Sequence, residues 1–271
     1  MISAADLQAY ERDGYLIAPQ LFSADEVERF REGLTRVEAG EYRKGKRPTL
    51  DLPIPPDPHA LRKIDNAWWA DPDLASLATD VRLGEIAAAL LDAPSIRLWQ
   101  DQLLDKPPTG IDTGNIGWHQ DWDSWRTVAS RDGFVTAWVA LDDVDEENGA
   151  MQVIVGSHHW GHLAGESNFL GTDVEGQLAA LAEARSAQPR HLSMKAGQAS
   201  FHHVLAFHGS GPNNSNRPRR SLAVHLMAGD VRAADEGEGW RHYNLGLLQS
   251  RGGGVGDLYA DDEWWPLVYS A

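Results

Sequence analysis

The segment Trp118-His119-Gln120-Asp121 carries the residue types with the clearest chemical meaning in this chain. Side chains of an extended segment alternate between its two faces, so the spacing predicts that His119 and Asp121 project together while Gln120 points away. An imidazole and a carboxylate on one side are suited to hold a metal ion. His-x-Asp is a short pattern that also occurs by chance, so it needs support from elsewhere in the chain.

A third metal ligand is predicted at His208, in an apolar and aromatic run that starts at Phe201 and stops at the glycine-rich turn beginning with Gly209. Two histidines and one carboxylate form the facial triad that leaves positions of a non-haem Fe(II) open for a co-substrate and O₂. His202 competes for the role, because it has the same strand parity as His208. The ligand set also suits a catalytic Zn²⁺, so a zinc hydrolase and a non-catalytic metal-binding barrel stay open as alternatives.

A basic segment with Arg217, Arg219 and Arg220 follows, and it leads into the apolar run of residues 221–227. An arginine at the head of the next strand can reach back beside the metal, where its planar fork suits a bidentate grip on a carboxylate. The alternative is that these arginines lie on a solvated turn, which we expect for two of the three.

Further segments occur in the order in which one enzyme family has them. They are an opening helix-to-strand passage, a strand before the first ligand, and an Asn-Gly segment that ends in Gly-Ser-His, at residues 10–17, 101–108 and 148–158. Together with the eleven-residue spacing from His208 to Arg219, they give the chain a resemblance to the phytanoyl-CoA dioxygenase family of Fe(II)/2-oxoglutarate-dependent oxygenases. The chain departs from the family pattern at Val155, where proline is usual.

The resemblance implies a role for each matching position. His119, Asp121 and His208 would be the catalytic iron ligands, with O₂ and 2-oxoglutarate as co-substrates. The positions implied for 2-oxoglutarate are Arg219 and Ser210 at its distal carboxylate, Trp138 beside it, and Lys106, which shares a strand face with Gln102. Trp122, Trp125 and His225 are candidates for contact with the substrate, although core packing is an equal or better explanation for each of them.

The activity implied by the resemblance is oxidation of an unactivated C–H bond of a small molecule. Hydroxylation in natural-product (secondary) metabolism is the default, and desaturation, epimerisation or cyclisation by the same oxidant are alternatives. A zinc hydrolase would have no use for a carboxylate-gripping arginine at Arg219.

The composition limits the other classes of function. The chain has 271 residues, a formal net charge of −16 and no cysteine. The missing cysteines exclude disulfides and thiolate sites, and the acidic balance argues against nucleic acid and, less strongly, against a coenzyme A thioester. No run approaches the ~20 apolar residues of a membrane span, and the first residues lack a signal-peptide pattern. We therefore expect a cytoplasmic enzyme whose partner is a small-molecule substrate.

The pattern of elements predicts a mainly β fold with flanking α-helices, a double-stranded β-helix of the jelly-roll, cupin-like type. Helices are expected at residues 4–12, 24–37 and 174–184, with two short ones in 73–91, and strands at 95–104, 134–141 and 152–155. Ser23 and Glu26 predict a capping box, and residues 40–60 an irregular loop over the barrel mouth. A single domain over residues 1–271 would comprise helical support (about 1–95), the barrel core (about 96–230) with an insertion or lid near 161–190, and a C-terminal extension (231–271).

Overall fold

The strands form two sheets in the computed structural model, which describes residues 2–54, 56–185, 187–236 and 241–271. The larger sheet has the order β1 (Tyr15–Ile17), β9 (Ala199–His203), β6 (Phe134–Ala140), β11 (Arg219–Ala228), β4 (Ser95–Lys106), β3 (Arg62–Asp65) and β2 (Leu50–Leu52), and β12 (Leu267–Ser270) also pairs with β4. The smaller sheet has the order β5 (Ile116–His119), β10 (His208–Ser210), β7 (Gln152–Ile154) and β8 (Pro189–His191). No strand pairing between described residues joins the two sheets, so the barrel is open at its sides.

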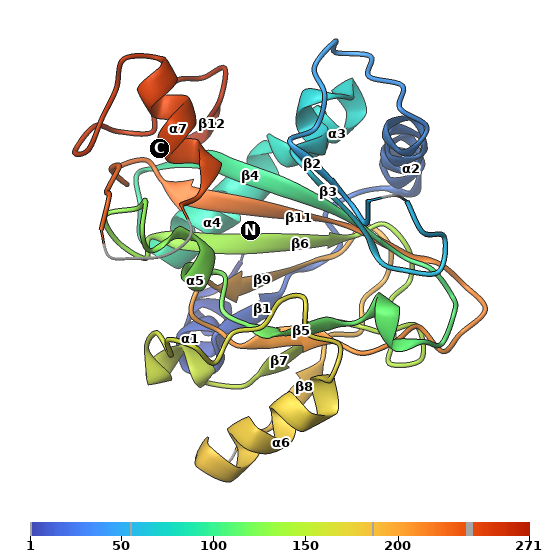
Figure 1. Cartoon of the computed structure of the whole chain (residues 1–271). Coiled ribbons are helices and arrows are strands. Elements are labelled where there is room, and N and C mark those ends of the chain that lie inside the picture. Colours follow the sequence, from blue (N-terminus) through green and yellow to red (C-terminus); the bar gives the residue numbers. More distant parts are fainter. Residues whose placement is uncertain (1, 55, 186, 237–240) are drawn as a thin grey trace.

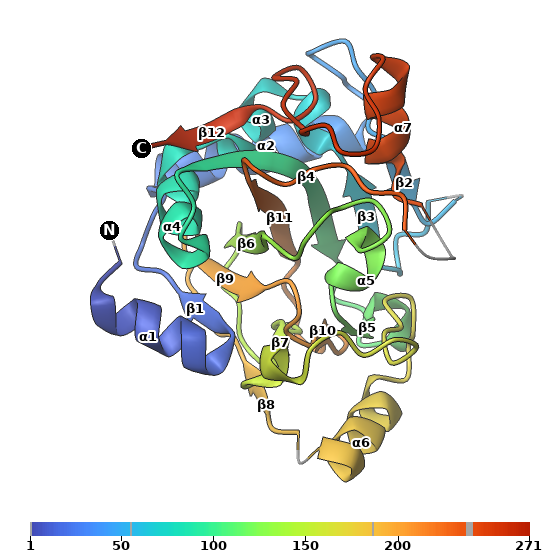
Figure 2. The same ribbon diagram turned by 90° about the vertical axis from the view of Figure 1, so that its left-hand side faces the viewer.

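Helices from the N-terminal part of the chain cover the outer face of the larger sheet, while the smaller sheet lies across its other side (Figures 1 and 2). The helices are α1 (Ala4–Asp13), α2 (Ala24–Glu38), α3 (Pro72–Ala78), α4 (Val81–Leu91), α5 (Trp122–Trp125), α6 (Val174–Arg185) and α7 (Tyr243–Ser250), with single 3₁₀ turns η1 (Ala67–Trp69), η2 (Asp112–Gly114) and η3 (Ser157–Trp160). Alternate residues of the central strands, such as Leu222 and Val224, are fully buried in one cluster with Phe30 and Leu74 of the helices. The remaining alternate residues face the smaller sheet. No helix of the described residues is long and apolar enough to cross a bilayer.

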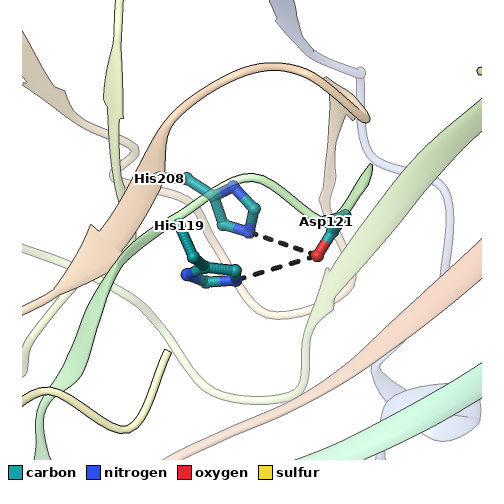
Figure 3. A group of neighbouring side chains, drawn as sticks. All are labelled: His119, Asp121 and His208. Atoms are coloured by element: carbon teal, nitrogen blue, oxygen red, sulfur yellow. Dashed lines mark ion pairs between the residues drawn. The ribbon is translucent and has the colours of Figure 1, made fainter. Parts of the chain in front are cut away.

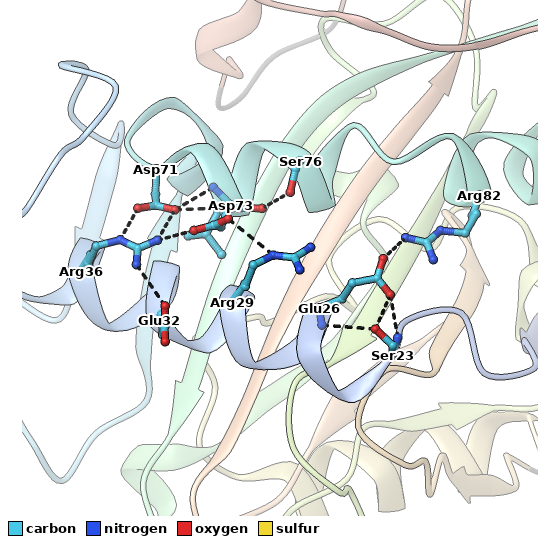
Figure 4. A network of polar contacts seen from close by, with 10 residues as sticks. Ser23, Glu26, Arg29, Glu32, Arg36, Asp71, Asp73, Ser76 and Arg82 are labelled. Carbon is cyan, nitrogen blue, oxygen red and sulfur yellow. Dashed lines mark hydrogen bonds and ion pairs between the residues drawn. The ribbon is translucent and has the colours of Figure 1, made fainter.

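Polar contacts fix the helices that back the larger sheet (Figure 4). The predicted capping box opens α2, because the Ser23 side chain accepts a hydrogen bond from the Glu26 backbone and the Glu26 carboxylate accepts one from the Ser23 backbone. Arg36 near the end of α2 donates two hydrogen bonds to Asp71, which also caps the start of α3. Asp71 is fully buried, and a bidentate pair with an arginine compensates the cost of removing its charge from water.

Two expectations about secondary structure are wrong. Residues 40–60 are not irregular throughout, because Leu50–Leu52 forms β2 and pairs with β3. The run from Phe201 to His208 is not one strand, because β9 ends at His203 and β10 begins at His208 in the other sheet. His202 and His208 therefore do not share a strand, and the contact between their rings, with centroids 4.2 Å apart, is made from one sheet to the other and not through strand parity.

The segment 161–190 contains the expected helix as α6 and lies against β5. The backbone amide of Gly117 donates to the carbonyl of Phe169 at 3.0 Å, and that of Asn168 donates to the carbonyl of Trp118 at 2.9 Å. These bonds occupy the edge of β5 that β10 leaves unpaired. The segment is thus fastened directly to the strand that carries His119.

Candidate active site

The three predicted metal ligands meet between the two sheets (Figure 3). His119 and His208 are directly opposite each other in the antiparallel pairing of β5 with β10, and their ring centroids are 4.1 Å apart. Oδ1 of Asp121 lies 3.7 Å from Nε2 of His119 and 3.8 Å from Nε2 of His208. One ligand atom from each residue falls within 4.8 Å of the others, and all three residues are buried. A single ion between them could be reached from all three side chains.

The alternation rule does not explain how Asp121 reaches this position. β5 ends at His119, and Asp121 has helical backbone angles (φ −57°, ψ −34°) at the start of α5. Gln120 is held away from the site, because its amide donates to the backbone carbonyls of Gly161 and Leu205. The predicted convergence is therefore present, but a turn after the strand produces it.

Backbone carbonyls orient both imidazoles. Nδ1 of His119 lies 2.8 Å from the carbonyl of Gly117, and Nδ1 of His208 lies 3.0 Å from that of Ala206. Each carbonyl requires a proton on Nδ1, which leaves the Nε2 lone pair facing the shared space. Burial lowers the pKa of both histidines, and it would raise the pKa of Asp121, but the surrounding imidazoles, His208 foremost, hold that pKa well below its ordinary value. Two neutral imidazoles and one carboxylate are the protonation states that bind a divalent cation.

The second oxygen of Asp121 faces the larger sheet. Oδ2 accepts a hydrogen bond of 2.7 Å from the Thr136 hydroxyl, which in turn lies 2.8 Å from Nδ1 of His225. Since a hydroxyl has one proton, Thr136 must accept from a protonated His225 Nδ1. Nε2 of His202 lies 3.4 Å from the same oxygen. His202 thus adjoins the oxygen that faces away from His119 and His208, which favours His208 over His202 as the third ligand.

Strand register explains why these groups share one row. Gln100, His225, Thr136 and His202 are successive partners across β4, β11, β6 and β9. Partners in register point to the same face of a sheet, so one row of the larger sheet faces the three metal ligands.

A pocket extends from the metal ligands to Arg219, and Trp138 and Gln102 also line it. The Arg219 guanidinium is 1% exposed and lies 5.3 Å from the centre of the Trp138 ring. Its Nε and Nη2 have no hydrogen-bond partner among the described residues, and burial lowers its pKa to about 10. A buried guanidinium with unsatisfied donors requires an anionic partner, and a carboxylate matches its planar fork.

Ser210 and Lys106 are close to Arg219 but differ in what they face. Ser210 lines the pocket, whereas Lys106 donates to the Ser210 hydroxyl at 2.7 Å and to the carbonyl of Gly211. Lys106 is fully buried, and burial, with the nearby Arg219 charge, lowers its pKa well below the ordinary value. In this geometry Lys106 fixes the hydroxyl of Ser210 rather than lining the pocket itself.

A second pocket of about 460 Å³ adjoins the first, and the two share Gln102, His119, Asp121 and Phe169. Of the candidates for substrate contact, Trp125 lines this outer pocket and His225 lines the inner one. The ring of Trp122 instead packs toward Phe134, with centroids 6.0 Å apart, at the edge of an apolar cluster.

Sequence reasoning missed Thr136 and Phe169. Thr136 is two residues before Trp138 on a predicted strand, so strand parity would have placed it on the same face. Phe169, whose ring lies edge-on to His119 at 4.7 Å, comes from the irregular part of the segment 161–190, where no periodic signal exists.

A family model described as phytanoyl-CoA dioxygenase (PhyH) matches residues 10–221 of the chain. The chain belongs to the phytanoyl-CoA dioxygenase family. The probable alpha-ketoglutarate-dependent hypophosphite dioxygenase of Stutzerimonas stutzeri is 27% identical, over 84% of this chain and 79% of that protein.

Solved structures of members of this enzyme class have the same fold. EctD from S. alaskensis, in its crystal structure with 2-oxoglutarate and 5-hydroxyectoine, is 26% identical and superposes with a TM-score of 0.69 over 89% of this chain and 82% of its own. The non-haem alpha-ketoglutarate-dependent carbocyclase SnoK from nogalamycin biosynthesis is 23% identical, with a TM-score of 0.73 over 99% and 97% of the two chains. The predicted jelly-roll fold and the predicted class, a non-haem Fe(II)/2-oxoglutarate-dependent dioxygenase, are confirmed.

Proposed function

We propose that this phytanoyl-CoA dioxygenase family member holds Fe(II) through His119, Asp121 and His208 and oxidises a C–H bond of a small organic molecule. The support is geometric: one ligand atom from each of the three residues lies within 4.8 Å of the others, and all three residues are buried. Iron, together with 2-oxoglutarate and O₂, supplies an oxidant strong enough for an unactivated C–H bond.

The observation that carries the proposal is the unsatisfied guanidinium of Arg219 at the end of the pocket that starts at the metal ligands. Arg219 would bind the distal carboxylate of 2-oxoglutarate, and Ser210, with its hydroxyl fixed by Lys106, would add a hydrogen bond. Trp138 would wall the co-substrate, and Gln102 would lie between it and the outer pocket. A zinc hydrolase would not need a buried arginine that binds a carboxylate, so that alternative does not explain the unsatisfied N–H groups of Arg219.

The protein's own part in the reaction is to position the reactants and to exclude water. The described site lies between two sheets, and His119, Asp121 and His208 are all buried, so the metal position is shielded from bulk water by the protein. We propose hydroxylation in natural-product metabolism as the outcome. Desaturation, epimerisation and cyclisation differ from it only in the fate of the substrate radical.

The replacement Arg219→Ala tests the proposal. Loss of a charge-assisted bidentate pair costs about 2–5 kcal/mol, so the KM for 2-oxoglutarate should rise by a factor of ~30 or more while Fe(II) affinity stays near that of the wild type. Succinate formation with Fe(II), ascorbate and varied 2-oxoglutarate measures the change. Arg217→Ala is the matched control, because Arg217 is 42% exposed and pairs with Asp145. An unchanged KM in Arg219→Ala, or turnover with Zn²⁺ and no 2-oxoglutarate, would contradict the proposed function.

A further inference from the structure

The outer pocket lies where a substrate of the proposed oxygenase would bind. It reaches His119 and Asp121 at one end and is separated from Arg219 by the inner pocket. Gln102 and Phe169 line both spaces, so they mark the boundary between them. What binds in the outer pocket must be compatible with its charges, its hydrogen-bonding groups and its apolar surface.

Two rows of the larger sheet form one wall of the outer pocket. In the first row, Leu50 of β2, Asp65 of β3 and Gln102 of β4 are partners in register. In the second, Leu52 is the partner of Lys63. Residues two apart on a strand share a face, so both leucines lie with the Lys63–Asp65 pair on the wall of the pocket. The leucines give this wall an apolar surface beside the charged pair, and Trp125 of α5 adds a further apolar group to the pocket lining.

The charges of the outer pocket cancel. Among the described residues that line it, Lys63 and Asp65 are charged, and Asp121 belongs to the metal site. The Lys63 ammonium donates directly to the Asp65 carboxylate, and both side chains are about nine-tenths buried. A cationic or anionic group that enters would have to break this pair to gain a counter-ion, and the partner left behind would be a buried, unpaired charge. A charged substrate is therefore penalised whichever sign it has.

The polar groups that β4 adds to the same wall, Gln100 and Gln102, mostly offer hydrogen-bond donors. Oε1 of Gln100 accepts from the Tyr243 hydroxyl at 2.7 Å and lies 2.9 Å from Nε2 of His242. With its oxygen used twice, the Gln100 amide is left with its NH₂ group to offer. The Gln102 amide has no hydrogen-bond partner in the described part of the chain and can donate or accept. Such donors match hydroxyl or carbonyl oxygens of a ligand.

We propose that the outer pocket selects an uncharged small molecule with an apolar body and hydroxyl or carbonyl groups, and that the Lys63–Asp65 ion pair is the element that rejects charged molecules. This inference rests on the proposed function, because it assigns the substrate class of the same site. It excludes coenzyme A thioesters, whose phosphates find no free cation among the described lining residues.

Matched probes that differ only in charge test the inference. Naphthylethanol, naphthylacetate and naphthylethylamine share one apolar body and carry a neutral, an anionic and a cationic group at neutral pH. Calorimetry under anaerobic conditions, with Fe(II) and 2-oxoglutarate bound, gives the three affinities. We expect naphthylethanol to bind about tenfold or more tightly than either charged probe, since burial of an unpaired charge is costly.

Replacement of each partner of the ion pair should shift the preference in opposite directions. Asp65→Asn leaves the Lys63 ammonium without a carboxylate, so the affinity for naphthylacetate should rise relative to naphthylethanol. Lys63→Met leaves the Asp65 carboxylate unpaired, so naphthylethylamine should gain instead. Lys195→Met is the control: Lys195 is 76% exposed and pairs with Asp143 at 2.8 Å, and its loss should leave all three affinities unchanged.

The affinity for 2-oxoglutarate separates failure of the inference from failure of the proposed function, and it also reports whether each variant is folded. A wild-type chain that does not bind 2-oxoglutarate would contradict the proposed function, whatever the order of the probes. A chain that binds 2-oxoglutarate but binds a charged probe as tightly as naphthylethanol, or binds none of the three, would overturn the inference alone. So would folded Lys63 and Asp65 variants whose preference matches that of the wild type.

Discussion

The two oxygens of Asp121 have different surroundings, and this division determines how the carboxylate can serve a metal. Oδ1 faces the Nε2 atoms of His119 and His208, whereas Oδ2 receives the Thr136 hydroxyl hydrogen bond. A ligand carboxylate whose distal oxygen is hydrogen-bonded keeps one orientation and presents one oxygen to the ion. His225 extends the chain, because its Nδ1 fixes the direction of the Thr136 hydroxyl.

Thr136→Val removes this restraint with almost no change of shape. Oδ2 of Asp121 would lose its hydrogen bond in a buried site, and we expect affinity for Fe(II) to fall by about 10–100-fold. Metal titration by calorimetry under anaerobic conditions measures the loss, and Thr136→Ser should restore most of it. Ser200→Ala is the control, since the Ser200 hydroxyl is also buried in the larger sheet but has no hydrogen-bond partner in the described structure. An equal loss in both variants would show that repacking, and not the hydrogen bond to Asp121, is responsible.

At the level of elements, the sequence predicts what periodicity and motifs encode. The strands at residues 95–104 and 134–141 and the helices at residues 4–12 and 24–37 are confirmed, because the helices have periodic apolar residues and the second strand is a nearly continuous apolar run. β2 and β3 were not predicted. A strand of three or four residues, such as Arg62-Lys63-Ile64-Asp65, is too short and too polar to show an alternation of apolar and polar residues. Their form depends on pairing with β4, which is a tertiary effect.

Prediction of the site is limited in the same way. The family resemblance gives the order and spacing of His119, Asp121, His208 and Arg219, so these four residues could be assigned to one site from the sequence. The turn that separates β9 from β10 lies in Val204-Leu205-Ala206-Phe207, which contains no glycine or proline, so no local signal reveals it. The groups around the ligands come from strand register, and a single sequence does not give register across strands distant in the chain.

The close pairing of β10 with β5 sets the distance between the two histidine ligands. Gly209 permits this pairing, because it has no side chain where the two backbones approach each other. A Cβ atom at Gly209 would lie 2.9 Å from the carbonyl oxygen of Ile116 and 3.2 Å from the carbonyl carbon of Gly117. Both are backbone atoms of the neighbouring strand, so Gly209→Ala must push the strands apart. We expect a loss of about 1–3 kcal/mol in the free energy of unfolding and weaker Fe(II) binding, measured by urea unfolding with and without metal. Gly211→Ala is the control, because a Cβ there meets no atom within 4 Å, and equal losses would contradict the argument.

On the scale of the whole molecule, a second group of histidines joins α1 to the sheet and to η3, away from the metal ligands. His203 at the end of β9 lies between Tyr10 of α1 and His158 of η3, with ring centroids 6.4 Å and 5.2 Å away. Burial lowers the pKa of His203 to about 4, and the proximity of His158, whose own pKa burial lowers, adds to the shift. Both rings are therefore neutral where the fold is stable, and a proton on either would be buried without a full counter-charge.

This arrangement predicts a loss of stability in mild acid. The unfolded chain protonates His203 near its ordinary pKa of about 6.5, whereas the folded chain does so only near 4, so the unfolded state binds more protons between these values. Stability should be unaffected by this group above about pH 7 and should fall as the pH drops from ~6.5 to ~4, by about 3 kcal/mol for His203 alone. Urea unfolding of metal-free protein across this range measures the loss. The His203→Gln variant cannot take up this proton, so its free energy of unfolding should fall less steeply over the same pH interval. If the free energy of unfolding falls equally with pH in both proteins, other buried groups control the acid sensitivity of the fold.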